Sequence, residues 1–429
     1  MALKKNQKRK TRKIAMLFSV TGITALVLVV ETYAWFVGTS IVKTSDFEIN
    51  VSTGDKLALS LDGTTWEEDT LTLTKDAILG TATGTDAHNA YTGHTNSWVG
   101  EQGLVPVSTD GSIDLTANRL KMYSKTAMTA TPGGYRLIAT RVDNYTSDED
   151  GLINEYNGYV AFDLFIRNGQ GTDYFADYNE ADDEAIYLTK ASTVTAAPAG
   201  TDNPDSKGLE NSVRVAFVQI GRVKWDSDVS DVTSINCTTE EAPENYTSES
   251  VKGINTGLCE AVTPTIWEPN DSAHHADLVT YFNGLCKSAT TSGTPATRTY
   301  GTDACTPVQT EGSDTKSALA ATSFVPTYVV KENITSTDDV DIYDGLNGIT
   351  PTKLEAVDTF TDTEKNATQT DRPKFFNLAA NSVTKIRVYI YLEGQDIDNY
   401  DIAALGEKIK VSFGFTKDQL DLANQESQN

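Results

Sequence analysis

The sequence predicts an all-β fold: a two-sheet sandwich of the jelly-roll or Greek-key type, with long loops, a disulfide-stapled insertion and an N-terminal signal or transmembrane helix. Two observations predict the sandwich. Roughly eight to ten segments alternate apolar and polar residues, as half-buried strands do. Thr, Ser, Asp and Gly dominate the segments between them, a composition typical of strands joined by turns.

The N-terminal segment has the pattern of an export signal. Seven basic residues and no acid occupy the first thirteen positions, and an apolar run over Ile14–Val30 follows. Thr32 and Ala34 place small side chains at positions minus three and minus one of a cleavage site before Trp35. We therefore expect a signal peptidase to act on this chain.

Two fates of residues 1–34 are open. Cleavage makes them a signal peptide, whereas retention makes them a membrane anchor, because the apolar run nearly reaches the length of a span. In both cases the basic flank stays in the cytoplasm and everything after Phe36 is exported. We expect an extracellular or cell-surface protein that touches the membrane only through this segment.

The strands are predicted from their alternation and from their β-branched and aromatic residues. Residues 62–130 are Thr- and Gly-rich with scattered aromatics, and we expect irregular connections there with one or two short strands. The predicted strands are Phe47–Val51, Lys56–Leu61, Tyr135–Val142, Gly158–Arg167, Ala185–Thr189, Ser212–Val223, Phe324–Lys331, Thr384–Leu392 and Lys408–Thr416.

The domain organisation follows from where regular alternation stops. After the signal, we expect residues 35–224 to form the first part of the sandwich and residues 225–322 to form a Cys-containing insertion or subdomain. Residues 323–429 are expected to contain the strands that complete the sandwich.

All the cysteines fall within the insertion, and an exported chain favours disulfides. Their spacings of 22, 27 and 19 residues do not form the close pairs that a zinc site uses. We expect two disulfides with three connectivities open among Cys237, Cys259, Cys286 and Cys305.

The charge balance excludes some partners. The chain has a net charge of −25, and because residues 1–34 are basic the remainder is more acidic still. Such a surface repels nucleic acid and anionic lipid. We expect no nucleic-acid partner.

No catalytic motif is present in the sequence. The four histidines form no His-Glu-x-x-His pattern, and the nucleophile elbow, the phosphate-binding loop and the dinucleotide fingerprint are missing. We expect no enzyme and no cofactor, with calcium as the one candidate ion. Asp339, Asp341 and Asp344 alternate before a glycine and could supply carboxylate oxygens to it, the alternative being exposed turn residues.

Both ends of the exported chain resemble the TasA and camelysin family. The junction Thr32-Tyr33-Ala34-Trp35-Phe36 is similar to the Thr-Tyr-Ala-x-Phe stretch that ends the signal peptides of that family, with Trp35 in place of a small residue. The closing run Lys408–Thr416 resembles the family's last strand, which ends in Phe-x-Phe. The resemblance implies a jelly-roll subunit, released by a dedicated signal peptidase, that assembles into fibres of the biofilm matrix with itself or related subunits.

In that family the freed N-terminal segment is thought to complete the sheet of the next subunit. Trp35, Phe36, Val37, Ile41 and Val42 are the apolar residues that could do so here, and such head-to-tail addition makes filaments. The alternatives are that Phe47–Val51 is an ordinary first strand of its own domain, and that the protein is a monomeric adhesin or coat protein that binds glycan or a host ligand.

Overall fold

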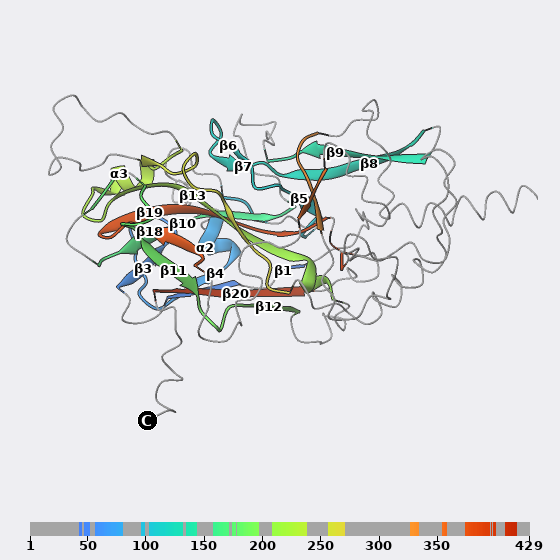
Figure 1. The fold of residues 1–429 in the computed structure, drawn as a ribbon. Helices are drawn as coiled ribbons and strands as arrows, with labels where there is room; N and C mark the ends of the chain where they lie inside the picture. The colour runs from blue at the N-terminus through green and yellow to red at the C-terminus, as the bar shows by residue number, and fades with distance from the viewer. Residues whose placement is uncertain are drawn as a thin grey trace, which may run out of the picture.

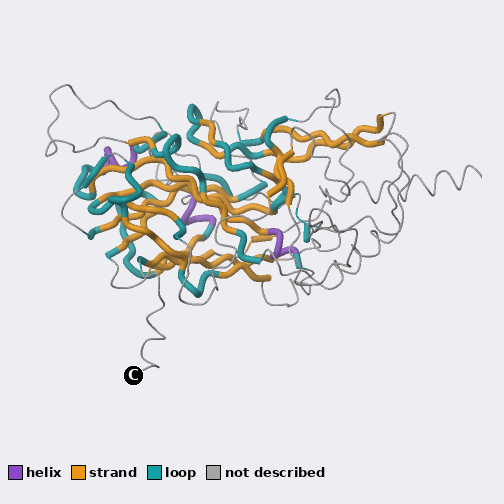
Figure 2. Tube along the Cα trace, viewed as in Figure 1, coloured by secondary structure: helices purple, strands orange, loops and turns teal. Residues whose placement is uncertain are grey.

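In the structure, a computed structural model, the regular secondary structure of the described residues is almost entirely strand (Figures 1 and 2). Helices in the described part are short: α2 (Lys75–Leu79), α3 (Val229–Ser234) and the 3₁₀ turn η1 (Leu209–Ser212). The structure describes residues 43–44, 47–51, 56–79, 96–98, 103–131, 134–143, 158–170, 174–176, 178–196, 208–237, 256–270, 327–333, 354–357, 374–394, 396, 398–399 and 408–417.

The first sheet has seven strands in the order β18-β11-β20-β2-β4, with β1 and β12 also paired to β20. Two of its strands, β20 and β12, are labelled in the lower part of Figure 1. Their bounds are β1 Lys43–Thr44, β2 Phe47–Val51, β4 Thr70–Leu73, β11 Glu184–Leu188, β12 Thr193–Ala196, β18 Phe376–Leu378 and β20 Lys408–Thr416.

The second sheet has six strands in the order β14-β13-β19-β10-β3, with β15 also paired to β13. Its long members pair antiparallel, and a bulge between Gln219 and Gly221 shifts the register of β13 against β19. Their bounds are β3 Leu57–Ser60, β10 Val160–Asn168, β13 Val213–Lys224, β14 Thr256–Gly257, β15 Thr265–Trp267 and β19 Ser382–Leu392.

The chain crosses between the two sheets many times. It passes from β2 in the first sheet to β3 in the second, back to β4, and later from β10 to β11 and from β18 to β19 and β20, whereas β12 follows β11 within the first sheet and β14 and β15 follow β13 within the second. Long-range pairing therefore dominates, and each sheet is built from segments that are distant in sequence.

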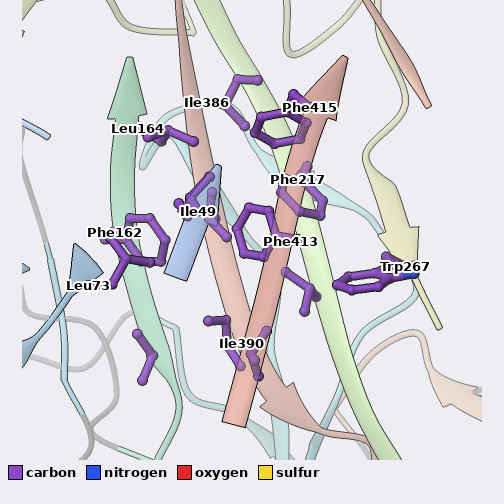
Figure 3. Close-up of a cluster of buried hydrophobic side chains, with 14 of the residues drawn as sticks. Ile49, Leu73, Phe162, Leu164, Phe217, Trp267, Ile386, Ile390, Phe413 and Phe415 are labelled. Carbon is purple, nitrogen blue, oxygen red and sulfur yellow. The ribbon is translucent and has the colours of Figure 1, made fainter. Parts of the chain in front are cut away.

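The main core lies between the two sheets, as expected for a sandwich-like fold. Ile49 and Phe413 of the first sheet meet Phe162, Phe217 and Ile390 of the second, all of them buried (Figure 3). Phe217 packs edge-to-face on Phe413, with ring centroids 5.2 Å apart. Each such side chain contributes about 1.5–3 kcal/mol through burial.

A covering layer lies over the outer face of the second sheet, at the top of Figure 1. Tyr389 of β19 and Phe165 of β10 pack there against Met122 and Val232, so the second sheet is buried on both faces. Besides α3, the layer contains two small sheets, and β16 and β17 form a further pair. The bounds are β5 Val107–Ser108, β6 Ile113–Asp114, β7 Arg119–Leu120, β8 Tyr123–Thr131, β9 Gly134–Arg141, β16 Thr327–Val330 and β17 Leu354–Val357.

The prediction of an all-β chain with few helices is confirmed. Residues 62–130 contain more strand than expected, because β4 to β7 and all but the last residue of β8 fall there. These strands are short or rich in Thr and Ala, and their pairing partners decide their conformation more than their own composition does. The predicted signal or membrane helix lies outside the described residues.

Candidate functional site

The N-terminal strand is held in the middle of the first sheet. β1 and β2 run parallel to β20, from Lys43 opposite Lys408 to Val51 opposite Phe415. On its other side β2 pairs antiparallel with β4. Ile49 is fully buried at the centre of this arrangement (Figure 3). The segment Phe47–Val51 is thus a strand of its own domain, one of the alternatives that the sequence left open.

The residues predicted to donate a strand lie just before this element. Trp35, Phe36, Val37, Ile41 and Val42 are outside the described residues, as are Thr32 and Ala34 of the cleavage site. Strand donation and signal cleavage therefore stay predictions.

The first sheet offers one edge strand beside the N-terminal strand. Among the described strands, β4 pairs only with β2. Thr72 is exposed and Leu73 is buried, so β4 has one solvated and one core-facing side. An exposed edge of this kind can accept another strand.

β12, which pairs with β20 off the main strand order, is linked to the neighbouring turn. The side chain of Asn270 donates hydrogen bonds to the carbonyl oxygens of Val194 in β12 and Glu210 in η1, at 3.1 and 3.3 Å. These contacts hold η1 beside β12.

A cationic and aromatic cluster forms one exposed patch on the second sheet. The guanidinium of Arg167, at the end of β10, lies 3.9 Å from the ring centre of Trp66 and 5.8 Å from that of Trp225. The side chain of Trp225 is 44% exposed. Burial lowers the pKa of Arg167, and the nearby charge of Glu68 acts in the opposite direction. An aromatic face beside a cation is a surface on which a planar or sugar-like ligand can stack.

Several buried charged side chains lie on or beside the second sheet, among them two groups of three. The carboxylate of Asp163 lies 2.8 Å from Nε of Arg387 and 3.1 Å from Nζ of Lys385, and all three residues are buried. Burial lowers the pKa of Lys385 although Asp163 acts to raise it.

The second group has the opposite balance. The guanidinium of Arg214 contacts the carboxylates of both Glu268 and Asp396. Here two acids share one cation, whereas Asp163 serves two cations. Every charged side chain in these groups contacts at least one opposite charge, and such pairing lowers the cost of burying it.

The described part of the chain contains one disulfide. Cys237 and Cys259 form a disulfide with Cα atoms 5.4 Å apart, and both side chains pack in the covering layer. The pairing is one of those that the three connectivities allow. Cys286 and Cys305 lie outside the described residues.

The predicted calcium ligands Asp339, Asp341 and Asp344 also lie outside the described residues. Within the part that is described, His, Cys, Asp and Glu form no group suited to a metal ion. No helix in that same part is long and apolar enough to cross a membrane.

Sequence reasoning did not find the aromatic patch. Trp66 and Trp225 are far apart in sequence from Arg167, and the pairing of β3, β10, β19 and β13 brings their chain segments together. The sequence feature that could have indicated the patch was Arg167 itself. A cation near the end of a strongly apolar strand often lies against an aromatic or acidic neighbour.

Comparisons with protein-family models, with curated proteins and with solved structures find no match to this chain. What the described residues define is an all-β, sandwich-like protein with a disulfide.

Proposed function

We propose that the chain is an exported structural subunit of an extracellular fibre or biofilm matrix, of the TasA and camelysin type, with a jelly-roll fold. Three features support the proposal: the basic and apolar N-terminal segment, the junction Thr32–Phe36, and the closing strand β20 that ends in Phe-Gly-Phe. The repeated crossing of the chain between two sheets favours the jelly-roll class.

The observation that carries the proposal is the parallel pairing of β1 and β2 with β20. Parallel neighbours are never joined by a tight turn, so sheet pairing alone fixes where this strand lies. Residues 35–42 directly precede it and are apolar at five positions. They have the composition and the place in the chain to extend beyond the subunit and pair with another one.

The acceptor in this proposal is the outer edge of β4 on a neighbouring subunit. Main-chain hydrogen bonds to the edge would supply affinity, and alternate apolar side chains of the donor would supply specificity. Each subunit then carries a donor and an acceptor at different places, which gives an open, head-to-tail filament.

Electron microscopy of the chain that begins at Trp35 tests the proposal. The informative variant lacks residues 35–42 but keeps Lys43 and the rest of β1 and β2, so that the sheet of each subunit stays complete. A matched control lacks residues 419–429. We expect filaments from the parent chain and the control and monomers from the N-terminal deletion.

Filaments from the N-terminal deletion would reject strand donation, and monomers from all three chains would reject the fibre function. The second result would leave a surface adhesin as the better account. The patch of Trp66, Arg167 and Trp225 favours this second function, because its exposed indole can stack on a sugar ring.

A glycan-binding screen of the monomer tests the adhesin. We expect Trp225→Ala to abolish binding and Phe175→Ala to preserve it, because Phe175 is a more exposed aromatic that is not part of the patch. Equal binding by both variants would remove the patch from consideration.

A further inference from the structure

Three side chains from different strands meet where the two sheets come together. Lys417 directly follows β20, the last strand of the first sheet. Asn168 is the last residue of β10 in the second sheet, and Glu184 is the first residue of β11. No local sequence pattern connects these positions.

The three groups are within hydrogen-bond distance of one another. Nζ of Lys417 lies 2.6 Å from Oδ1 of Asn168 and 2.9 Å from Oε2 of Glu184. The same carboxylate oxygen accepts a hydrogen bond from Nδ2 of Asn168 at 2.8 Å. One oxygen of Glu184 therefore reaches both the amine and the amide nitrogen.

Two backbone groups complete the arrangement around the carboxamide. The N–H of Gln170 donates to Oδ1 of Asn168 at 3.3 Å, and Nδ2 of Asn168 donates to the carbonyl oxygen of Ala379 at 3.0 Å. Asn168 is fully buried, and the side chains of Lys417 and Glu184 are 13% and 28% exposed. The carboxamide is thus fixed in orientation, with its carbonyl carbon beside an amine.

From this geometry we propose that Lys417 and Asn168 form an intramolecular isopeptide bond, with Glu184 as the catalytic acid and base. Lysine is a competent nucleophile once it loses its proton. Glu184 takes that proton, and Nζ then attacks Cγ of Asn168. Proximity of this kind replaces an encounter in solution and supplies most of the acceleration that such a slow reaction needs.

The remaining steps balance in atoms and charge. Attack places negative charge on Oδ1, where the N–H of Gln170 stabilises it. Glu184 passes its proton to Nδ2, the bond between Cγ and Nδ2 breaks, and the amide nitrogen leaves as ammonia. Glu184 takes the second proton of Nζ. Overall, an ammonium and a carboxamide become a secondary amide and an ammonium ion, and no oxidant or cofactor takes part.

The bond would join the end of β20 to the end of β10 and so lock the two sheets together covalently. This proposal does not depend on fibre formation, because the reaction is complete within one folded chain.

Mass spectrometry of tryptic peptides from the denatured full-length protein tests the bond. We expect a branched peptide that joins the segments around Asn168 and Lys417, lighter than its two parts by one ammonia molecule. Trypsin should also fail to cleave after Lys417. Two separate peptides of full mass, from wild-type protein that had folded before it was denatured and digested, would overturn the proposal. An ammonia loss confined to other asparagines would also overturn it.

Variants assign the roles. Glu184→Gln should leave both peptides at full mass. Lys417→Arg keeps a cation beside Glu184 but has no primary amine, so it should also fail to cross-link, and it keeps the test decisive where the first variant does not fold. Glu180→Gln is the matched control, because Glu180 pairs with the exposed Lys374 on a neighbouring segment. It should cross-link like the wild type. A branched peptide in Lys417→Arg would overturn the assignment.

Discussion

Asp163 is the carboxylate that the buried cations Lys385 and Arg387 share. Its carboxylate receives hydrogen bonds from Arg387 at 2.8 and 3.1 Å, and its backbone N–H donates to Oδ1 of Asn96 at 3.0 Å. The two cations beside it are buried as deeply as the carboxylate itself. Removing this one negative charge leaves both of them without compensation.

We therefore expect Asp163→Asn to lower the free energy of unfolding by about 3–5 kcal/mol, the cost of breaking a buried ion pair by removing one partner. Urea denaturation followed by tryptophan fluorescence measures this. Lys374→Ala is the control, because it breaks the exposed pair with Glu180 and should cost about 1 kcal/mol or less. Equal effects of the two substitutions would contradict the account.

Asp62 gives the protein an acid-sensitive loop. Burial alone would raise its pKa, but hydrogen bonds from the backbones of Thr65 and Thr64 and from nearby side chains lower it to about 2 from a value of 3.8. Because the folded-state pKa is the lower one, the carboxylate stabilises the fold fully above pH 3.8. That stabilisation is lost as the pH falls towards 2.

Asp62→Asn should consequently make the free energy of unfolding depend less on pH at acidic pH. We expect the substitution to cost about 1 kcal/mol at neutral pH and less at pH 2, after allowing for solvent screening. Thermal unfolding followed by circular dichroism at pH 6 and pH 2 measures the difference. A loss that is the same at both pH values would mean that the loop does not depend on the charge of Asp62.

At the scale of elements, α3 depends on a close approach to the loop after β3. Gly63 has φ of +72°, and a Cβ atom at this position would lie 2.9 Å from Cγ1 of Val232 in α3. Both the backbone conformation and the contact require glycine. The turn at Gly63 thus determines how α3 covers the outer face of the second sheet.

Gly63→Ala should destabilise the protein by about 1–3 kcal/mol, from backbone strain together with the clash. Gly111→Ala is the matched control, since Gly111 has φ of +81° and a Cβ there would meet only Ile266, at 3.9 Å. The difference in chemical denaturation midpoint between the two variants reports the clash alone. A Gly111→Ala effect as large as that of Gly63→Ala would assign the whole cost to backbone strain.

The elements show which parts of the fold could be predicted from sequence. Alternation and β-branched or aromatic residues placed β2, β10, β13, β19 and β20 close to their observed bounds, because both signals lie in the residues of the strand itself. The same alternation cannot identify neighbours. The parallel pairing of β2 with β20 joins residues at opposite ends of the chain, and no local pattern encodes it.

The candidate sites were harder to predict for the same reason. Asp163, Lys385 and Arg387 alternate with apolar residues and resemble a solvated face, yet the covering layer buries them. The positions of Lys417, Asn168 and Glu184 become related only after both sheets have formed. In each case long-range pairing supplied the information that local sequence lacks.

For the whole molecule, the net charge of −25 is a source of self-repulsion. Salt screens that repulsion over roughly 30 Å at 0.01 M and 3 Å at 1 M. We expect the melting temperature of the chain from Trp35 to rise by several degrees between these salt concentrations, as differential scanning calorimetry would show. A melting temperature that falls with salt would indicate that ion pairs outweigh the repulsion.

The parallel arrangement of β1, β2 and β20 also determines how the molecule responds to tension. The start of β1 at Lys43 and the end of β20 at Thr416 lie at opposite ends of one paired ribbon. Pulling these two ends apart slides the strands along each other, so every hydrogen bond between them bears load at the same time. An antiparallel pair pulled from adjacent ends would instead open one bond after another. The domain is therefore built to resist stretching between its two termini by shear.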